Sequence, residues 1–119
     1  GTWTPTVVGT SSAGTGTYAA NGQTGRYIKC GSLVHVQLRV LLTNHTGTGN
    51  IRISGLPFNS ANYAEGHSAA SISLLDNLAM TAGNYPSAIV NVNSNFISLF
   101  QAPMDTAWNI CLSASYIAA

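Results

Sequence analysis

The alternation of apolar and polar residues from Leu33 to Leu42 constrains the fold more than any other feature of this sequence. Every second position is aliphatic, and these positions are Val34, Val36, Leu38, Val40 and Leu42. The positions between the first four are polar, namely His35, Gln37 and Arg39. Successive side chains of a strand point to opposite faces of the sheet, so this period predicts one long, half-buried β-strand.

The remainder of the chain repeats the strand pattern, and no window has apolar residues at helical spacing over three turns. Further strands are expected at Trp3 to Val8, Ile51 to Ser54, Ser68 to Leu75, Ala88 to Val92, Phe96 to Phe100 and Ala107 to Ile117. Residues 72–80 are the one segment that could be helical instead. Short strands at regular spacing favour a single all-β domain over residues 1–119, a jelly-roll-like antiparallel β-sandwich.

Turn-forming residues suggest how these strands are connected. The stretch from Thr43 to Gly49 is rich in Thr, Gly and Asn, which predicts a hairpin between the Leu33–Leu42 strand and Ile51–Ser54. Gly9 to Thr17 is expected to be a loop, and Asn21-Gly22 is typical of a hairpin turn.

Charged residues make up only 6% of the chain, against about 25% in an average globular protein. The surface must be wetted by neutral polar groups, and the chain has 13 serines, 12 threonines, 11 asparagines and 12 glycines. A net charge of +1 without a basic run makes nucleic acid an unexpected partner. Because interface cores are depleted of charge, we expect part of this surface to be hidden in a homo-oligomer.

The two cysteines, Cys30 and Cys111, are too far apart in sequence for a Cys-x-x-Cys motif. We expect two buried thiols that pack as small hydrophobic groups, with a single disulfide as the alternative. His45 and His67 have no third ligand at persuasive spacing, so no metal site and no cofactor are expected. No run approaches the roughly 20 apolar residues of a membrane helix, so membrane insertion is not expected either.

Four short motifs, taken in order, resemble a known protein family. They are Gly1-Thr2-Trp3-Thr4-Pro5, Gly25-Arg26-Tyr27-Ile28-Lys29-Cys30-Gly31 with the strand Leu33-Val34-His35-Val36 after it, Gly55-Leu56-Pro57-Phe58, and Ser113-Ala114-Ser115-Tyr116-Ile117. Together they are similar to the C-terminal domain of bacteriophage tail fibres and tailspikes. Cys30 departs from the pattern, because an aliphatic residue is expected there.

The resemblance implies a jelly-roll-like sandwich at the distal end of a homotrimeric fibre, which serves trimer assembly, attachment to the host surface, or both. It implies a place in the virion, at the tip of a tail fibre or tailspike, with synthesis in the bacterial cytoplasm and action outside the cell. The chain begins at Gly1 rather than Met, so we expect a C-terminal fragment of a longer fibre or tailspike.

No catalytic constellation stands out, and we do not expect an enzyme. Glycoside hydrolysis needs two carboxyl groups about 5 to 9.5 Å apart, and the chain offers only Glu65, Asp76 and Asp105, scattered over expected turns. The segment from Gly66 to Ala70 lacks the second glycine of a nucleophile elbow.

Recognition of a cell-surface polysaccharide or lipopolysaccharide is the preferred function, since sugars stack on aromatic rings flanked by amides and carboxylates. Three expected loops carry that mixture and could gather at one end of a sandwich. Their candidate ligand-binding residues are Tyr63, Glu65, His67, Tyr85, Asp105 and Trp108.

Structural roles compete with each of these assignments. Trp108 begins an apolar strand face and is typical of a core residue. Trp3 is expected to pack the first strand onto the sheet or onto a neighbouring subunit. His35, Gln37 and Arg39 share a strand face that could be a ligand groove, a subunit interface or a solvated surface. At the level of function, a trimerisation or folding cap without a ligand and an accessory domain of a polysaccharide depolymerase are the alternatives.

Overall fold

The computed structural model describes residues 1–63, 67–80 and 82–119, and those residues form nine strands and no helix. No helix in this described part of the chain could therefore cross a membrane. The strands are β1 (Thr2–Trp3), β2 (Thr6–Gly9), β3 (Gly16–Cys30), β4 (Leu33–His45), β5 (Asn50–Ser54), β6 (Ser68–Asp76), β7 (Ser87–Val90), β8 (Phe96–Pro103) and β9 (Asn109–Ile117).

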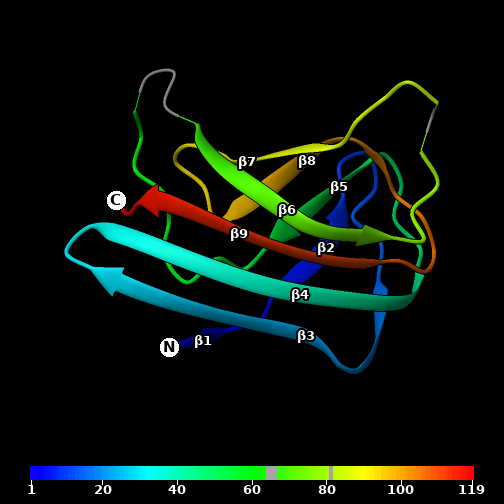
Figure 1. Ribbon diagram of the computed structural model, residues 1–119, viewed down its shortest axis with the longest axis horizontal. Helices are drawn as coiled ribbons and strands as arrows, with labels where there is room; N and C mark the ends of the chain where they lie inside the picture. Colours follow the sequence, from blue (N-terminus) through cyan, green and yellow to red (C-terminus); the bar gives the residue numbers. More distant parts are fainter. Residues whose placement is uncertain (64–66, 81) are drawn as a thin grey trace.

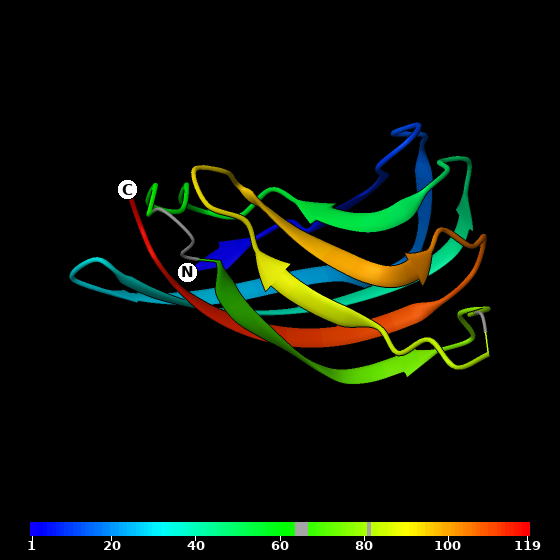
Figure 2. The ribbon, with the colours of Figure 1, turned by 90° about the horizontal axis from the view of Figure 1, so that it is seen from above.

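All nine strands belong to one antiparallel sheet with the order β1-β3-β4-β9-β6-β7-β8-β5-β2 (Figure 1). The sheet curls so that its two halves face each other, as Figure 2 shows. We call β1-β3-β4-β9-β6 the first layer and β7-β8-β5-β2 the second layer. The pairing of β6 with β7 joins the layers at one edge. The predicted jelly-roll-like antiparallel β-sandwich is confirmed, and its two layers are the two halves of one continuous sheet.

A single hydrophobic core fills the space between the layers. The aliphatic positions predicted from the alternation in β4 all point into it, as do Trp108 and Tyr116 at the two ends of the last apolar run. The second layer contributes residues such as Ile53, Ile97 and Leu99, each at most 1% exposed. The period-two pattern therefore identified the buried face of the sheet correctly.

The predicted hairpin between β4 and β5 is wrong. β4 pairs with β3 and β9, whereas β5 pairs with β2 and β8 in the other layer. The turn-rich stretch after His45 carries the chain from one layer to the other instead of reversing it within a layer. Alternation specifies which face of a strand is buried, but it does not specify the neighbouring strand.

β3 was missed, because the region around Asn21-Gly22 was expected to form a loop and a hairpin. It forms the longest strand of the fold, and Asn21 has a φ of 56° within it. The register against β4 shifts between Tyr18 and Gln23, so the Asn-Gly pair produces a bulge rather than a chain reversal. A Cβ atom at Gly22 would lie 2.6 Å from the Leu41 carbonyl oxygen, which explains why the bulge needs glycine there.

Two further expectations are also wrong. Residues 72–76 continue β6 and residues 77–80 are not helical, so the helical alternative for 72–80 fails. Cys30 and Cys111 are free thiols, and neither is buried: Cys30 is exposed and Cys111 is half-buried. Both occupy outward positions of the first layer, and Cys111 does so because its neighbours Ile110 and Leu112 point into the core.

The motifs that carry the family resemblance meet in the folded chain. Trp3 lies opposite Gly25 in the pairing of β1 with β3, and its indole nitrogen donates a hydrogen bond of 3.2 Å to the Arg26 carbonyl. The ring of Tyr27 makes an edge contact with Phe58 at 5.4 Å between centroids. Trp3 therefore packs the first strand onto the sheet, as expected, and these signature residues act as structural contacts between distant segments.

Candidate functional site

The outer face of the first layer carries a broad, shallow depression, which we call the outer trough. Four adjoining pockets on this face share lining residues, so they form one continuous surface across β3, β4, β9 and β6. Its lining side chains are those of Arg26, Ile28, His35, Gln37, Arg39, Ser71, Ser73, Cys111, Ser113 and Ser115.

The strand register explains how these residues come together. Arg26 lies opposite Gln37, Gln37 lies opposite Ser113, and Ser113 lies opposite Ser71, so one row of side chains crosses all four strands. On β3 and β4 the row consists of the long side chains of Arg26 and Gln37. On β9 and β6 it consists of the small side chains of Ser113 and Ser71. Small side chains leave room for another surface to approach the sheet closely.

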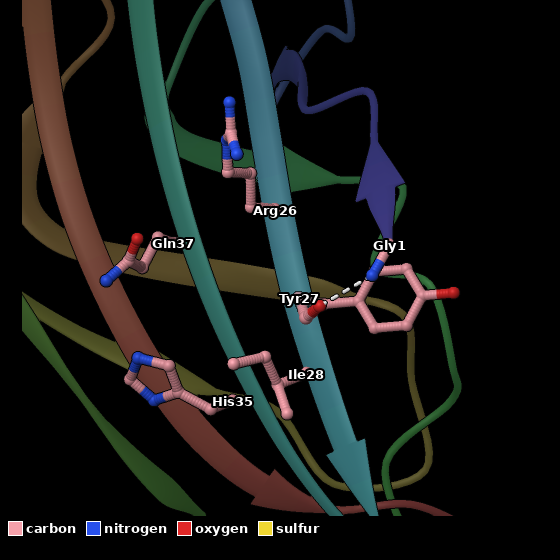
Figure 3. A pocket seen from close by; sticks show the side chains of 6 residues that line it. All are labelled: Gly1, Arg26, Tyr27, Ile28, His35 and Gln37. Carbon is pink, nitrogen blue, oxygen red and sulfur yellow. Dashed lines mark hydrogen bonds between the residues drawn. The ribbon is translucent and has the colours of Figure 1, made fainter.

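One end of the trough is a pocket of about 290 Å³, at the lower end of the roughly 300–1,000 Å³ of small-molecule sites (Figure 3). Its wall includes the chain's first residue, because the Gly1 amino group donates a hydrogen bond of 2.8 Å to the Tyr27 carbonyl. Ile28 lies in the same pocket with 72% of its surface exposed. Such an exposed aliphatic side chain is suited to contact with a partner surface.

A histidine and a serine lie close together in the trough. His35 Nδ1 and Ser115 Oγ lie 2.9 Å apart, which is the distance of a hydrogen bond between a nucleophile and a base. In the described part of the chain no carboxylate holds the other ring nitrogen, so the pair lacks the third member of a triad. Arg26 and Arg39 have no ion-pair partner among the described residues, and they remain available to carboxylates of another molecule.

The candidate ligand-binding residues are divided between opposite ends of the molecule. Tyr63 and His67 are exposed just before β6 begins, and Glu65 lies outside the described residues. Asp105 lies at the other end, because its carboxylate accepts a hydrogen bond from the Ala79 amide just after β6 ends. Tyr85 lies at that end too, because its amide donates a hydrogen bond to Gln101 near the end of β8. A nine-residue strand spans about 26 Å, so the three loops do not gather into one site.

Trp108 is not available to stack on a ligand. Its side chain is 1% exposed, and its indole nitrogen donates a hydrogen bond of 3.1 Å to the Asp105 carbonyl. The residue belongs to the core, the structural role that its apolar strand face favoured. Its assignment to a binding site therefore has to be corrected.

Tyr85 and Asp105 keep surface positions at their shared end. Tyr85 is 81% exposed, and its backbone amide donates a hydrogen bond of 3.0 Å to Oε1 of Gln101. Asp105 is half-buried, and its Oδ2 accepts a hydrogen bond of 3.1 Å from the Ala79 amide. The carboxylate thus fastens the segment after β6, while the tyrosine ring remains free.

A cation–π pair that the sequence did not predict lies on the outer face of the second layer. The guanidinium carbon of Arg52 in β5 lies 4.1 Å from the centre of the Phe96 ring in β8. The alternation Ile51-Arg52-Ile53 places Arg52 on the outward face, but nothing in the sequence links it to an aromatic residue more than 40 positions later.

Comparisons with known proteins were made for the whole chain. No family model matches it, and a search of curated protein sequences finds no match. Among solved structures, the chain is similar to the Dettilon tailspike protein gp208, with a TM-score of 0.69 and 18% sequence identity. The aligned region covers 96% of this chain and 23% of the tailspike chain, so the chain spans less than a quarter of that protein. This likeness shows a shared fold.

Proposed function

We propose that the chain is the distal domain of a bacteriophage tailspike or tail fibre, which assembles as a homotrimer and binds a glycan of the host cell surface. The observation that carries the proposal is the fold, which aligns over 96% of the chain with part of a tailspike. The sequence motifs of the same family point in the same direction, and they were identified without that comparison.

The outer trough supports an assembly role, with a second copy of the chain as its occupant. Ile28, Leu33 and Leu74 are exposed on this face by 72%, 50% and 42%. Ile28 and Leu33 lie near each other, because Ile28 pairs with His35, two residues along β4 from Leu33. Exposed aliphatic groups that lie together mark sites of protein–protein contact.

Charge placement favours a cyclic contact. Arg26 lies on β3, at one flank of the face, and Asp76 lies at the end of β6, at the other flank. In a ring of three copies each interface joins two different patches, so the basic flank of one copy meets the acidic flank of the next. The pairing would also remove both charges from water at the same time.

Assembly through the first layer leaves the second layer and the loop ends free for a ligand. Tyr85 at one end and Tyr63 at the other are exposed aromatic rings beside asparagines, the side chains that stack on sugars and bond to their hydroxyl groups. These residues support the glycan-binding part of the proposal.

The proposal is tested by deleting residues 1–119 from the full fibre and measuring assembly and adsorption separately. A trimeric fibre that no longer adsorbs to its host, together with binding of the isolated trimer to host polysaccharide on a glycan array, is the expected result. Normal adsorption without the domain, combined with no glycan binding, would overturn the receptor role.

Two alternatives make different predictions for the same experiment. If the domain is a folding cap, its deletion yields monomers or aggregates rather than a trimer that has lost adsorption. If it is an accessory domain of a depolymerase, the isolated chain releases no reducing ends from polysaccharide, and the remaining fibre keeps that activity.

A further inference from the structure

The outer face of the second layer is built differently from the outer trough. Its outward side chains include the aromatic rings of Phe96 and Phe100 on β8 and the guanidinium group of Arg52 on β5. Strands β5, β8 and β7 run side by side here, as Figures 1 and 2 show. One cation thus stands on a surface that is otherwise aromatic, aliphatic and hydroxylated.

The position of Arg52 is fixed by its neighbours. It lies opposite Val8 on one side and Ser98 on the other, and Ser98 in turn lies opposite Ile89. Its guanidinium carbon sits 4.1 Å from the Phe96 ring centre, within cation–π distance. A stacked guanidinium loses little further freedom when it binds a ligand, because its plane is already held.

The positive charge of Arg52 is not neutralised by any described residue of the protein. Its Nε is buried and has no hydrogen-bond partner, and no carboxylate of the described residues pairs with the side chain. Because Arg52 is already partly desolvated, binding an anionic ligand costs it less desolvation free energy than it would cost a fully hydrated arginine. The guanidinium edge is suited to a carboxylate, which it can bind through two parallel hydrogen bonds.

Aromatic rings extend the surface away from Arg52. Phe100 is 45% exposed and lies four residues along β8 from Phe96, a separation of about 13 Å in an extended strand. Phe100 is paired with Ser87, and Tyr85, with an exposed ring, comes two residues before Ser87. The surface is long enough for several linked sugar rings.

From this arrangement we propose that the outer face of the second layer binds an acidic oligosaccharide, with Arg52 holding a sugar carboxylate and Phe100 stacking on a neighbouring sugar. The inference rests on the proposed function and narrows its ligand to glycans that contain uronic or sialic acids. The bound sugar would be held by charge and stacking, with Ser87 and Gln101 near enough to the surface to bond to hydroxyl groups.

The test uses the trimeric chain and a panel of bacterial oligosaccharides that contain uronic or sialic acids, each paired with its carboxyl-reduced form. Reduction turns the carboxylate into an alcohol and keeps the rest of the sugar. At least one acidic member should bind, and its reduced form should bind about 10- to 100-fold more weakly, the loss expected for a charge-assisted hydrogen bond.

Substitutions then locate the site. Arg52→Gln should weaken binding of the acidic ligand about 10- to 100-fold and leave the affinity for the reduced ligand unchanged. The affinity of Arg52→Lys for the acidic ligand should lie between those of the parent chain and Arg52→Gln. Phe100→Ala should weaken both ligands by up to about 10-fold, because it removes stacking. The matched control is Lys29→Gln, which removes a cation that lies outside both the outer trough and the Arg52 surface and should change neither affinity.

The results separate this inference from the proposed function. Binding to neutral glycans alone, or acidic binding that survives Arg52→Gln, would overturn the inference and leave a glycan-binding domain in place. Failure of the whole panel to bind overturns the inference, and normal host adsorption after deletion of the domain would overturn the receptor function as well. Thermal unfolding of each variant confirms that a loss of affinity is not a loss of fold.

Discussion

The Tyr116 hydroxyl donates a hydrogen bond of 2.9 Å to the carbonyl of Phe58. This bond joins the last strand to the Gly-Leu-Pro-Phe segment that follows β5, and Tyr116 itself is 2% exposed. The Phe58 ring also contacts Tyr27. Phe58 thus connects three of the four motifs on which the resemblance rests, so these motifs have a structural role in the fold.

Replacing Tyr116 with Phe removes the hydroxyl and leaves the Phe58 carbonyl without this partner. We expect a loss of about 1–2 kcal/mol in the free energy of unfolding, measured in urea at fixed protein concentration. Tyr85→Phe is the control, because its ring is exposed, and its effect should stay within about 0.5 kcal/mol. Equal stabilities of the two variants would show that the buried hydrogen bond has no net value.

Burial raises the pKa of Tyr116 above its ordinary value of 10.0. The folded state therefore keeps the proton at pH values where the unfolded chain loses it. The contribution of this group is constant below pH 10 and is lost as the pH rises through the folded pKa. Unfolding free energy measured between pH 9 and 11.5 should fall more steeply in the parent than in Tyr116→Phe, and parallel curves would contradict this.

The indole ring of Trp3 packs so closely against Gly25 that no side chain fits at position 25. A Cβ atom at position 25 would lie 2.6 Å from the ring, so Gly25→Ala should cost about 1–3 kcal/mol through overpacking. The double variant Trp3→Leu/Gly25→Ala should cost less than the sum of the two single changes, because the clash is removed. Additive effects in this cycle would show that the two residues do not share the space.

His45 links the two layers at one end of the sandwich. Its Nδ1 accepts a hydrogen bond of 2.8 Å from the Gly47 amide, so Nε2 carries the proton and donates to the Val7 carbonyl at 2.9 Å. His45→Ala should destabilise the fold by about 2–4 kcal/mol and accelerate hydrogen exchange of the β2 amides. Asn44→Ala, at an exposed neighbouring position, should leave both quantities unchanged.

The alternation of apolar and polar residues predicted which face of each strand is buried, but not which strands are neighbours. Val34, Val36, Leu38 and Val40 were assigned to the core correctly, because a period of two depends only on the strand itself. The neighbours of β4 and β5 were not predictable, since pairing depends on contacts across the whole chain. Asn21-Gly22 was misread for a related reason: the same dipeptide fits a turn or a bulge, and the flanking pairing with β4 decides.

The candidate site was also predicted only where the sequence around a residue decides its position. The surface position of Tyr85 could be predicted, because the sequence places this residue in an expected loop. The assignment of Trp108 to the ligand was wrong, and its place on an apolar strand face already favoured the core. Arg52 was missed because its significance comes from Phe96, which reaches it only through the pairing of β5 with β8.

The assignment of the outer trough to the subunit interface predicts the effect of a bulky substitution there. Gln37 is exposed at the centre of the trough, so Gln37→Trp should be accepted by the folded monomer and should block association. Ser87→Trp places the same side chain on the outer face of the second layer and should leave assembly intact. The reverse pattern would move the interface to the second layer.

The solution mass of the unmodified 119-residue chain, measured by light scattering over a range of concentrations, tests the central claim most directly. We expect a mass three times the 12.3 kDa of one chain, which persists at low concentration and is lost in Gln37→Trp. A mass of one chain at every concentration would contradict the trimer and the interface assigned to the outer trough.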